Sequence, residues 1–201
     1  MSNKGFTVWF TGLSCSGKST LAKMLREELL GRGLRVEWLD SGTIRKNLNS
    51  DLGFTRENIE ANLKRIAYEC KLLNRNGTAV IVSAVSPYRE TRDQIRADIG
   101  RFVEVYCRCP LEVLSQRDRN GLFEGAKKGD IANVAGINAP YEEPMKPEVL
   151  CNTDQEPPEK SLQSLVKTLE ILGYLGQRGT GAYSAEEEAL IKDRLKDLGY
   201  I

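Results

Sequence analysis

The sequence predicts an α/β domain in which helices cover both faces of a doubly wound, mainly parallel sheet of about five strands. Apolar runs of strand length alternate along the chain with segments of helical periodicity, which is the order typical of parallel sheets. A glycine-rich turn at 12–19, GLSCSGKS, separates the first strand from the first helix. We therefore expect ligands at the carboxyl ends of the strands, where this turn lies.

The individual elements follow from the local pattern of apolar residues. Strands are expected at 6–11, 35–40, 78–85, 102–109 and, at the sheet edge, 149–151; helices are expected at 21–30, 43–48, 56–76, 88–99, from Pro110 onward, and at 159–172. The strand at 78–85 is nearly all apolar, so both of its faces should be covered. The helix at 56–76 should bury the side that carries Ile59, Leu63, Ile66, Ala67, Cys70 and Leu73.

Two later segments depart from this alternation. Between 119 and 147, glycines and prolines punctuate a charged stretch with little periodicity, which predicts a lid over the ligand or, alternatively, a disordered surface insertion. Residues 173–181 have the composition of a linker, and Ser184 with Glu187 forms a capping box ahead of a helix to about Leu198. This helix should pack on its own domain or on a second subunit through Leu190, Ile191, Leu195 and Leu198.

The turn at 12–19 matches the phosphate-binding pattern G-x-x-x-x-G-K-[ST] in its required strand-to-helix setting. Gly12 and Gly17 permit a tight wrap in which backbone N–H groups point into one anion-sized concavity. Lys18 would reach the β- and γ-phosphates, and the Ser19 hydroxyl would bind Mg²⁺. The pattern favours a nucleoside triphosphate over a plain glycine turn. The expected pocket residues are Gly12, Leu13, Ser14, Cys15, Ser16, Gly17, Lys18, Ser19 and Thr20.

Composition limits the remaining function classes. The 29 Lys and Arg residues against 28 Asp and Glu give a net charge of +1, which provides no long-range attraction to nucleic acid or an anionic membrane. The N-terminus lacks the zones of a signal peptide and the chain lacks an apolar run of membrane length, so a cytoplasmic location is expected. Five cysteines without framework spacing fit a reducing compartment. Because the chain has no histidine, proton transfer falls to carboxylate, lysine or solvent.

Cys15 lies inside the phosphate-binding turn, at the start of a helix. A helix N-terminus lowers a thiol pKa, which predicts that Cys15 acts as a redox brake on nucleotide binding. The alternative is a small residue that the turn tolerates.

From Gly5 to about Leu175 the chain resembles the adenylylsulfate (APS) kinases. The resemblance is carried by TGLSCSGKST at 11–20, NLNSDLGF at 47–54, SAVSPYRETR at 83–92, EVYCRCPLEV at 104–113, and, farther on, RDRNGLF, GINAPYEEP and PEV. It implies a P-loop kinase domain over 1–175, with a linker and C-terminal helix over 176–201. It also implies transfer of the ATP γ-phosphate to the 3′-hydroxyl of APS with Mg²⁺. The implied partner is a nucleotide-like small-molecule acceptor. Nucleic acid and membrane are not expected as partners, and a homodimer is one possible assembly.

The resemblance also implies residue roles. Lys18, Asp40 and Ser86 would be catalytic, with Asp40 holding Mg²⁺ through water together with Ser19. Ser86 aligns with a serine that the family describes as a phosphoserine intermediate, although direct in-line transfer needs only positioning and charge neutralisation, and a simple turn residue is the alternative. Further expected site residues, each with a bland alternative, are Arg45 (a surface ion pair), Phe54 (core filling), Arg117 on ATP (pairing with Asp118), and Asn62 on the acceptor.

Several acceptor-side positions depart from the family pattern. Ser41, Gly42 and Thr43 replace the Gly-Asp-Asn that usually follows the aspartate. Ile59 stands for an acceptor-binding arginine, Gly125 for a lid lysine and Val134 for the aromatic that stacks on the adenine of APS. Three functions stay open: an APS kinase with a raised KM, a kinase for another acceptor such as cytidine diphosphoramidate, and a nucleotide-binding protein with little turnover.

Overall fold

The structure is a computed structural model and describes residues 4–176 and 185–201. Its single sheet has the strand order β2-β3-β1-β4-β5, and all four neighbouring pairs are parallel. The strands are β1 (Thr7–Thr11), β2 (Val36–Asp40), β3 (Ala79–Ser83), β4 (Phe102–Arg108) and β5 (Val149–Asn152). This confirms the predicted fold class, including a short last strand at the sheet edge.

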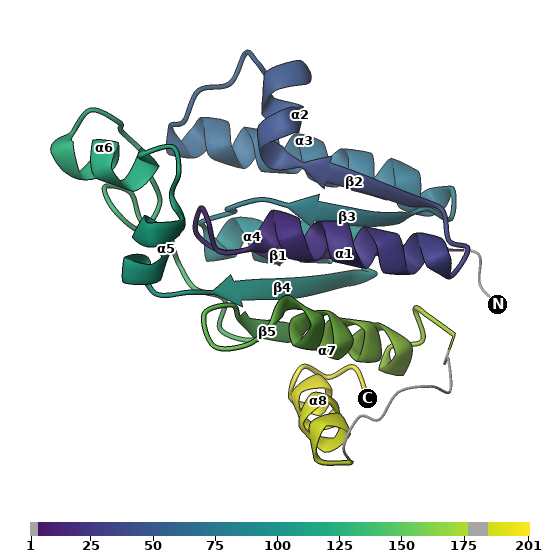
Figure 1. Ribbon diagram of the computed structural model, residues 1–201. Coiled ribbons are helices and arrows are strands. Elements are labelled where there is room, and N and C mark those ends of the chain that lie inside the picture. The colour runs from purple at the N-terminus through teal and green to yellow at the C-terminus, as the bar shows by residue number, and fades with distance from the viewer. Residues whose placement is uncertain (1–3, 177–184) are drawn as a thin grey trace.

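Helices cover both faces of the sheet (Figure 1). The helices α1 (Lys18–Gly31) and α7 (Pro158–Ile171) pack on one face, while α3 (Arg56–Arg75) and α4 (Arg89–Ile99) pack on the other. The remaining helices are α2 (Ser41–Asn47), α5 (Leu111–Arg117), α6 (Leu122–Lys128) and α8 (Ala185–Asp197). None of the helices in the described ranges combines the length and apolar character that spanning a membrane requires.

The central strand β1 joins the two halves of the core. Val8 and Phe10 lie in the cluster formed with α1 and α7, whereas Trp9 points to the opposite face and joins α3 and α4. This is the two-residue alternation of a strand covered on both sides. All five residues of β3 are buried, which confirms that both faces of that strand are covered.

The carboxyl ends of the strands meet at one edge of the sheet, and the turn at 12–19, hereafter the phosphate loop, lies there (Figure 1). At the same edge β2 passes directly into α2, and α5 and α6 follow β4. Side chains from distant parts of the chain are thereby brought to one place.

The segment 119–147 is more ordered than its composition suggests. Part of it forms α6, whose first turn is capped by Asp118, because the Asp118 Oδ2 accepts a hydrogen bond from the Phe123 N–H at 2.8 Å. Phe123 and Val134 are buried in a cluster with Leu114, and Leu13 of the phosphate loop packs against it. The alternative prediction of a disordered surface insertion is therefore wrong. The role of the segment as a lid stays a prediction.

The C-terminal helix α8 packs on α7, so the expected packing on its own domain is confirmed. Leu195 is fully buried and Lys167 on α7 pairs with Glu188 on α8 at 2.9 Å. The predicted stripe is wrong at Leu190, which is 71% exposed, whereas Ile191 and Leu198 are half-buried. Ser184 and residues 177–181 of the expected linker lie outside the described residues.

Candidate active site

The phosphate loop has the backbone geometry of an anion cradle. Gly12 has a φ of 141°, and a Cβ there would lie 2.5 Å from the carbonyl oxygen of Cys107 and 2.8 Å from the Ser16 Oγ. Gly17 has a φ of 90° at the N-terminus of α1. Both glycines are therefore needed for the wrap, as the sequence predicts. The arrangement fits the triphosphate of a nucleotide, because the concavity lies at the start of a long helix.

Lys18 is buried within this loop. Its Nζ donates to the carbonyl oxygen of Gly12 at 2.9 Å and to that of Leu13 at 2.6 Å. Burial lowers the pKa of Lys18 to about 8. A polyphosphate within reach of Nζ would favour the charged form and raise that pKa again. Lys18 is thus held ready for an anion.

Two cavities border the phosphate loop. The larger, of about 540 Å³, is lined on the loop side by Ser14, Cys15, Lys18 and Ser19. The smaller, of about 310 Å³, is lined by Cys15, Gly17, Thr20 and Arg117 among others. Gly12, Leu13 and Ser16 line neither cavity. A nucleotide role for those three residues therefore rests on their backbone.

Asp40 faces the larger cavity from the end of β2. Its Oδ1 accepts hydrogen bonds from the Thr43 N–H at 3.0 Å and the Thr43 hydroxyl at 3.2 Å, which caps α2. Its Oδ2 accepts from the Ser83 hydroxyl at 2.9 Å. Carboxylate oxygens have about two acceptor directions each. Asp40 can therefore hold a metal-bound water while it keeps these bonds, and with Ser19 in the same cavity the pair fits Mg²⁺ chemically.

Ser86 is the most constrained residue of the site. Its φ of 40° is unusual for a residue with a side chain, and it is 2% exposed. The Ser86 hydroxyl donates to the Thr11 Oγ1 at 2.9 Å and accepts from the Trp9 Nε1 at 3.1 Å. The Ser86 carbonyl accepts from the Arg92 Nη1 at 2.6 Å. These bonds fix both the side chain and the carbonyl of Ser86 at the wall of the larger cavity. A simple turn residue does not require so many contacts, so the geometry favours a role in the site.

Arg45 and Phe54 form one unit at the cavity mouth. The Arg45 guanidinium carbon lies 4.7 Å from the centroid of the Phe54 ring, and the Arg45 Nη1 donates to backbone carbonyls of Leu52, at 3.4 Å, and Gly53. Burial lowers the pKa of Arg45. Phe54 is 61% exposed and lines the cavity, so the core-filling alternative is wrong. Arg45 therefore contacts backbone carbonyls instead of forming the surface ion pair that was the alternative prediction.

Asn62 is fully buried at the cavity floor. Its Oδ1 accepts from the Asn49 Nδ2 at 2.8 Å, and its Nδ2 donates to the Ser41 Oγ at 3.3 Å. Asn49 in turn accepts from Arg65, which is also paired with Asp51 at 2.8 Å. Asn62 therefore links α3 to the start of α2.

The three departures from the family pattern give the cavity an apolar wall. Ile59 and Val134 line it directly. A Cβ at Gly125 would lie 2.8 Å from the Cδ1 of Ile131, so Ile131 occupies the space beside that glycine and lines the cavity as well. The cations that line this cavity are Lys18, Arg45 and Lys46.

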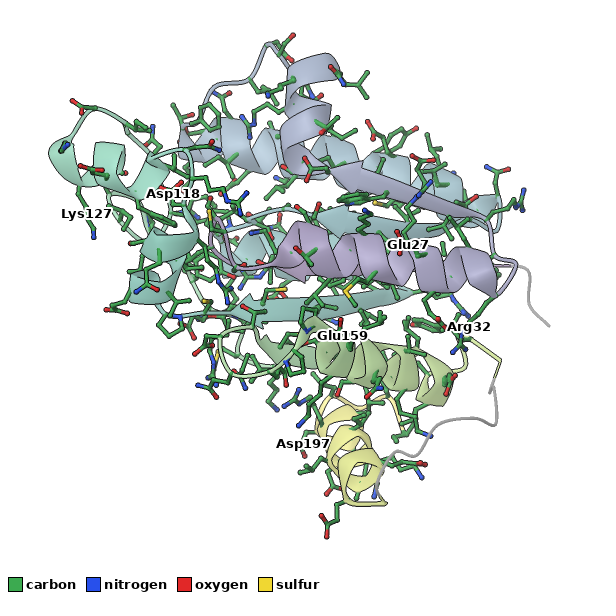
Figure 2. The ribbon with its side chains drawn as sticks, in the orientation of Figure 1. Glu27, Arg32, Asp118, Lys127, Glu159 and Asp197 are labelled. Carbon is green, nitrogen blue, oxygen red and sulfur yellow. The ribbon has the colours of Figure 1, made fainter. Side chains whose placement is uncertain are left out.

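Arg117 lies on the other side of the phosphate loop. Its guanidinium donates to the Thr153 Oγ1 at 3.2 Å and to the Thr153 carbonyl at 2.8 Å. The alternative that Arg117 pairs with Asp118 is wrong, because the Asp118 carboxylate caps the turn into α6. Figure 2 shows Asp118 and Lys127 at the end of the molecule where the phosphate loop lies, and Arg32 at the far end of α1.

The expectation for the Cys15 thiol is wrong. Burial and the nearby carboxylate of Asp118 raise the pKa of Cys15, and the opposing effects of Lys18 and Arg117 are smaller. Cys15 is therefore a slow nucleophile at neutral pH, which removes the physical basis of the redox brake.

Several site residues were missed by sequence reasoning. Trp9, Thr11 and Arg92 hold Ser86, and Tyr141 reaches the Thr11 hydroxyl at 3.0 Å. Thr11, Arg92 and Tyr141 lie within the family-like segments TGLSCSGKST, SAVSPYRETR and GINAPYEEP, which was the available signal, whereas Trp9 lies in none of them. Two of these contacts join residues far apart in sequence, Trp9 with Ser86 (77 positions) and Thr11 with Tyr141 (130 positions), whereas Arg92 lies only 6 positions from Ser86.

Comparison with known proteins agrees with this geometry. A model of the family described as adenylylsulphate kinase matches residues 4–152. The chain is 46% identical over 175 residues to an adenylyl-sulfate kinase of Picosynechococcus sp., covering 87% of this chain and 99% of that protein. It is 49% identical over 175 residues to a probable bifunctional SAT/APS kinase 2 of Sorangium cellulosum, covering 87% of this chain but only 30% of that longer protein.

A solved structure is also similar. The Mycobacterium tuberculosis APS kinase CysC, in complex with AMPPNP and APS, aligns with a TM-score of 0.79 at 37% identity, over 83% of this chain and 98% of that one. Fold, phosphate loop and family match agree, and the chain belongs to the adenylylsulphate kinase family.

Proposed function

We propose that this chain phosphorylates the 3′-hydroxyl of adenylylsulfate with the γ-phosphate of ATP. One observation carries the proposal: a single cavity of about 540 Å³ contains Lys18 and Ser19 of the phosphate loop on one side and Arg45, Phe54 and Ser86 on the other. A phosphate donor and a hydroxyl acceptor can therefore meet within one cavity, as in-line transfer requires.

The residues around the phosphate loop support positions for the phosphates and the adenine of ATP and for Mg²⁺. The phosphates would lie in the phosphate loop, with Lys18 moving from the loop carbonyls to the β- and γ-phosphates. Arg117 lines the smaller cavity, where its planar guanidinium can stack on the adenine base. Ser19 directly, and Asp40 through water, would hold Mg²⁺, which neutralises charge on the phosphate oxygens. Asp40 also orients the polar groups at the end of β2 around the site of transfer.

The acceptor half uses the rest of the large cavity. The Arg45 guanidinium supplies positive charge for the phosphosulfate, and the Phe54 ring supplies a face for the nucleoside. Asn62 keeps α2 and α3 in register beneath the acceptor. Ser86 positions the ribose and needs no covalent intermediate, because its hydroxyl is already engaged with Thr11 and Trp9.

The test is a direct assay. The purified chain is incubated with ATP, Mg²⁺ and APS, and the doubly phosphorylated product is followed by anion-exchange chromatography together with ADP. We expect product only with all three components, and Lys18→Ala should reduce the rate by more than about 100-fold. A parallel reaction with cytidine diphosphoramidate tests the other acceptor. Turnover of that compound alone would contradict the proposal.

The oligomeric state and location form a coarser proposal. Leu48, Tyr68 and Leu72 are large apolar side chains exposed on the side of α2 and α3, which favours a homodimer through that face. The five cysteines are free, which favours a cytoplasmic location. Sedimentation velocity of wild type and Tyr68→Glu tests the dimer. We expect a dimer for the first and a monomer for the second, and a wild-type monomer would contradict the proposal.

A further inference from the structure

The C-terminal segment reaches into the core through one side chain. After α8, Gly199 adopts a φ of 77° and the Tyr200 N–H donates to the Leu195 carbonyl at 3.0 Å, which turns the chain back toward the sheet. The Tyr200 hydroxyl donates to the Glu148 Oε1 at 2.8 Å and accepts from the Arg96 Nη1 at 3.2 Å. Tyr200 lies beyond the residues that the family model matches.

Glu148 is the buried centre to which Tyr200 is attached. It is 2% exposed, and its Oε2 accepts from the Glu104 N–H at 2.6 Å and the Arg96 Nη2 at 3.1 Å. A buried carboxylate is costly unless its oxygens are satisfied, so each donor counts. Burial and the charge of Glu148 raise the pKa of Tyr200, so the hydroxyl keeps its proton and remains a donor.

From Glu148 an unbroken series of charged side chains leads to the active site. The Arg96 Nη2 donates to the Glu104 Oε2 at 3.2 Å, and the Arg92 Nε donates to the Glu104 Oε1 at 2.7 Å. The Arg92 Nη1 then donates to the Ser86 carbonyl at 2.6 Å. Arg92 and Glu104 are both buried, so this path is shielded from solvent and small displacements are transmitted along it.

Ser86 is the sensitive end of this path. A residue with a side chain adopts a φ of 40° only when surrounding contacts hold it there, and the Arg92 bond is one of those contacts. A change at Tyr200 that weakens the contacts of Glu148 and Arg96 should therefore alter the backbone conformation of Ser86.

We propose that Tyr200 is a positioning residue for the acceptor side of this kinase, acting through Glu148, Arg96, Glu104 and Arg92 on the backbone of Ser86. The inference rests on the proposed function for its kinetic readout only. Because the path meets the backbone of Ser86, which lines the large cavity on the same side as Arg45 and Phe54, Tyr200 affects acceptor binding more strongly than ATP binding.

The kinetic test uses Tyr200→Phe, which removes the hydroxyl and keeps the ring. We expect the KM for APS to rise about 3- to 10-fold, while the KM for ATP stays within about twofold of wild type. Tyr174→Phe, the same change at a tyrosine whose ring packs on Phe6 outside the path, is the matched control and should leave both values unchanged. An unchanged KM for APS in Tyr200→Phe overturns the inference, as does an equal rise for both substrates.

The second test needs no substrate. The Trp9 indole N–H donates to the Ser86 Oγ at 3.1 Å, whereas the Trp38 indole N–H donates to the Ser83 Oγ at 3.0 Å. In ¹⁵N-labelled protein, we expect Tyr200→Phe to shift the Trp9 indole signal and to leave the Trp38 signal in place. Trp38→Phe assigns the two signals, because the chain has 2 tryptophans.

Glu104→Gln breaks the path at its middle and keeps the shape of the side chain. In that background Tyr200→Phe should no longer shift the Trp9 signal. An unshifted Trp9 signal in Tyr200→Phe, or the same shift with and without Glu104→Gln, overturns the inference. If the wild-type chain fails to phosphorylate APS, the proposed function fails, and the Trp9 signal still decides the role of Tyr200.

Discussion

At the scale of single residues, Lys18 shows how burial prepares a side chain for its ligand. Its ammonium group is satisfied by two loop carbonyls yet is desolvated enough that its pKa falls to about 8. In the unfolded chain the pKa would be close to the ordinary value of about 10.4. Folding therefore favours loss of the Lys18 proton, and an anion in the loop favours its return.

This predicts a pH dependence of ATP binding. Bound phosphates raise the pKa of Lys18, so binding takes up a proton when the pH exceeds about 8. ATP affinity should stay level below that pH and fall above it, by at most about tenfold per pH unit. Isothermal titration calorimetry from neutral to alkaline pH measures this, and Lys18→Ala should bind weakly with a flat profile. A wild-type profile as flat as that of the variant would refute it.

The apolar wall of the large cavity, which includes Ile59 and Val134, predicts a reduced affinity for APS. An arginine contact to an anion contributes about 1.5–3 kcal/mol and a stacked base about 1–3 kcal/mol. Ile59→Arg with Val134→Phe should therefore lower the KM for APS by about 10²- to 10⁴-fold and leave the KM for ATP unchanged. Steady-state kinetics with Ile59→Leu as the matched control tests this. A wild-type kcat/KM already near about 10⁴–10⁸ M⁻¹s⁻¹, with no gain in the double variant, would count against it.

At the scale of the elements, α8 depends on one buried contact. Leu195 is fully buried, whereas Leu190 on the same helix is 71% exposed. Leu195→Ala should lower the free energy of unfolding by about 2–5 kcal/mol, because it leaves a cavity against α7. Leu190→Ala is the matched control and should change it by less than about 0.5 kcal/mol. Urea unfolding measures both, and equal effects would mean that α8 packs differently.

At the scale of the whole molecule, nucleotide binding and stability are linked through the phosphate loop. A ligand present at 100 times its Kd stabilises the folded state by about 2.7 kcal/mol, which raises the Tm of a domain of this size by about 5–10 °C. Thermal unfolding monitored by circular dichroism should show this shift with ATP. Lys18→Ala should show little of it, and a full shift in that variant would place the nucleotide elsewhere.

The parts of this molecule that sequence predicted well are those encoded locally. The phosphate loop follows from eight consecutive residues, and each strand of the sheet from its own apolar run. The support of Ser86 could not be predicted in full, because Trp9 and Thr11 on β1 meet Ser86 only once the sheet has formed, and Arg92 alone is close to it in sequence. The pKa of Cys15 was predicted with the wrong sign because burial and the nearby Asp118 carboxylate, which only the fold reveals, raise it.

The close approach of Gly12 to Cys107 has a consequence for synthesis on the ribosome. β1 pairs with β3 and β4, so Thr7 can pair only after Val80 and Phe102 have been synthesised. The loop after β1 also lies against the carbonyl of Cys107. Such distant pairings form late and slowly. A nascent chain that has not yet exposed β4 thus carries the complete phosphate-binding sequence without the surface that shapes it. The capacity to hold a nucleotide arises only after Cys107 has left the exit tunnel.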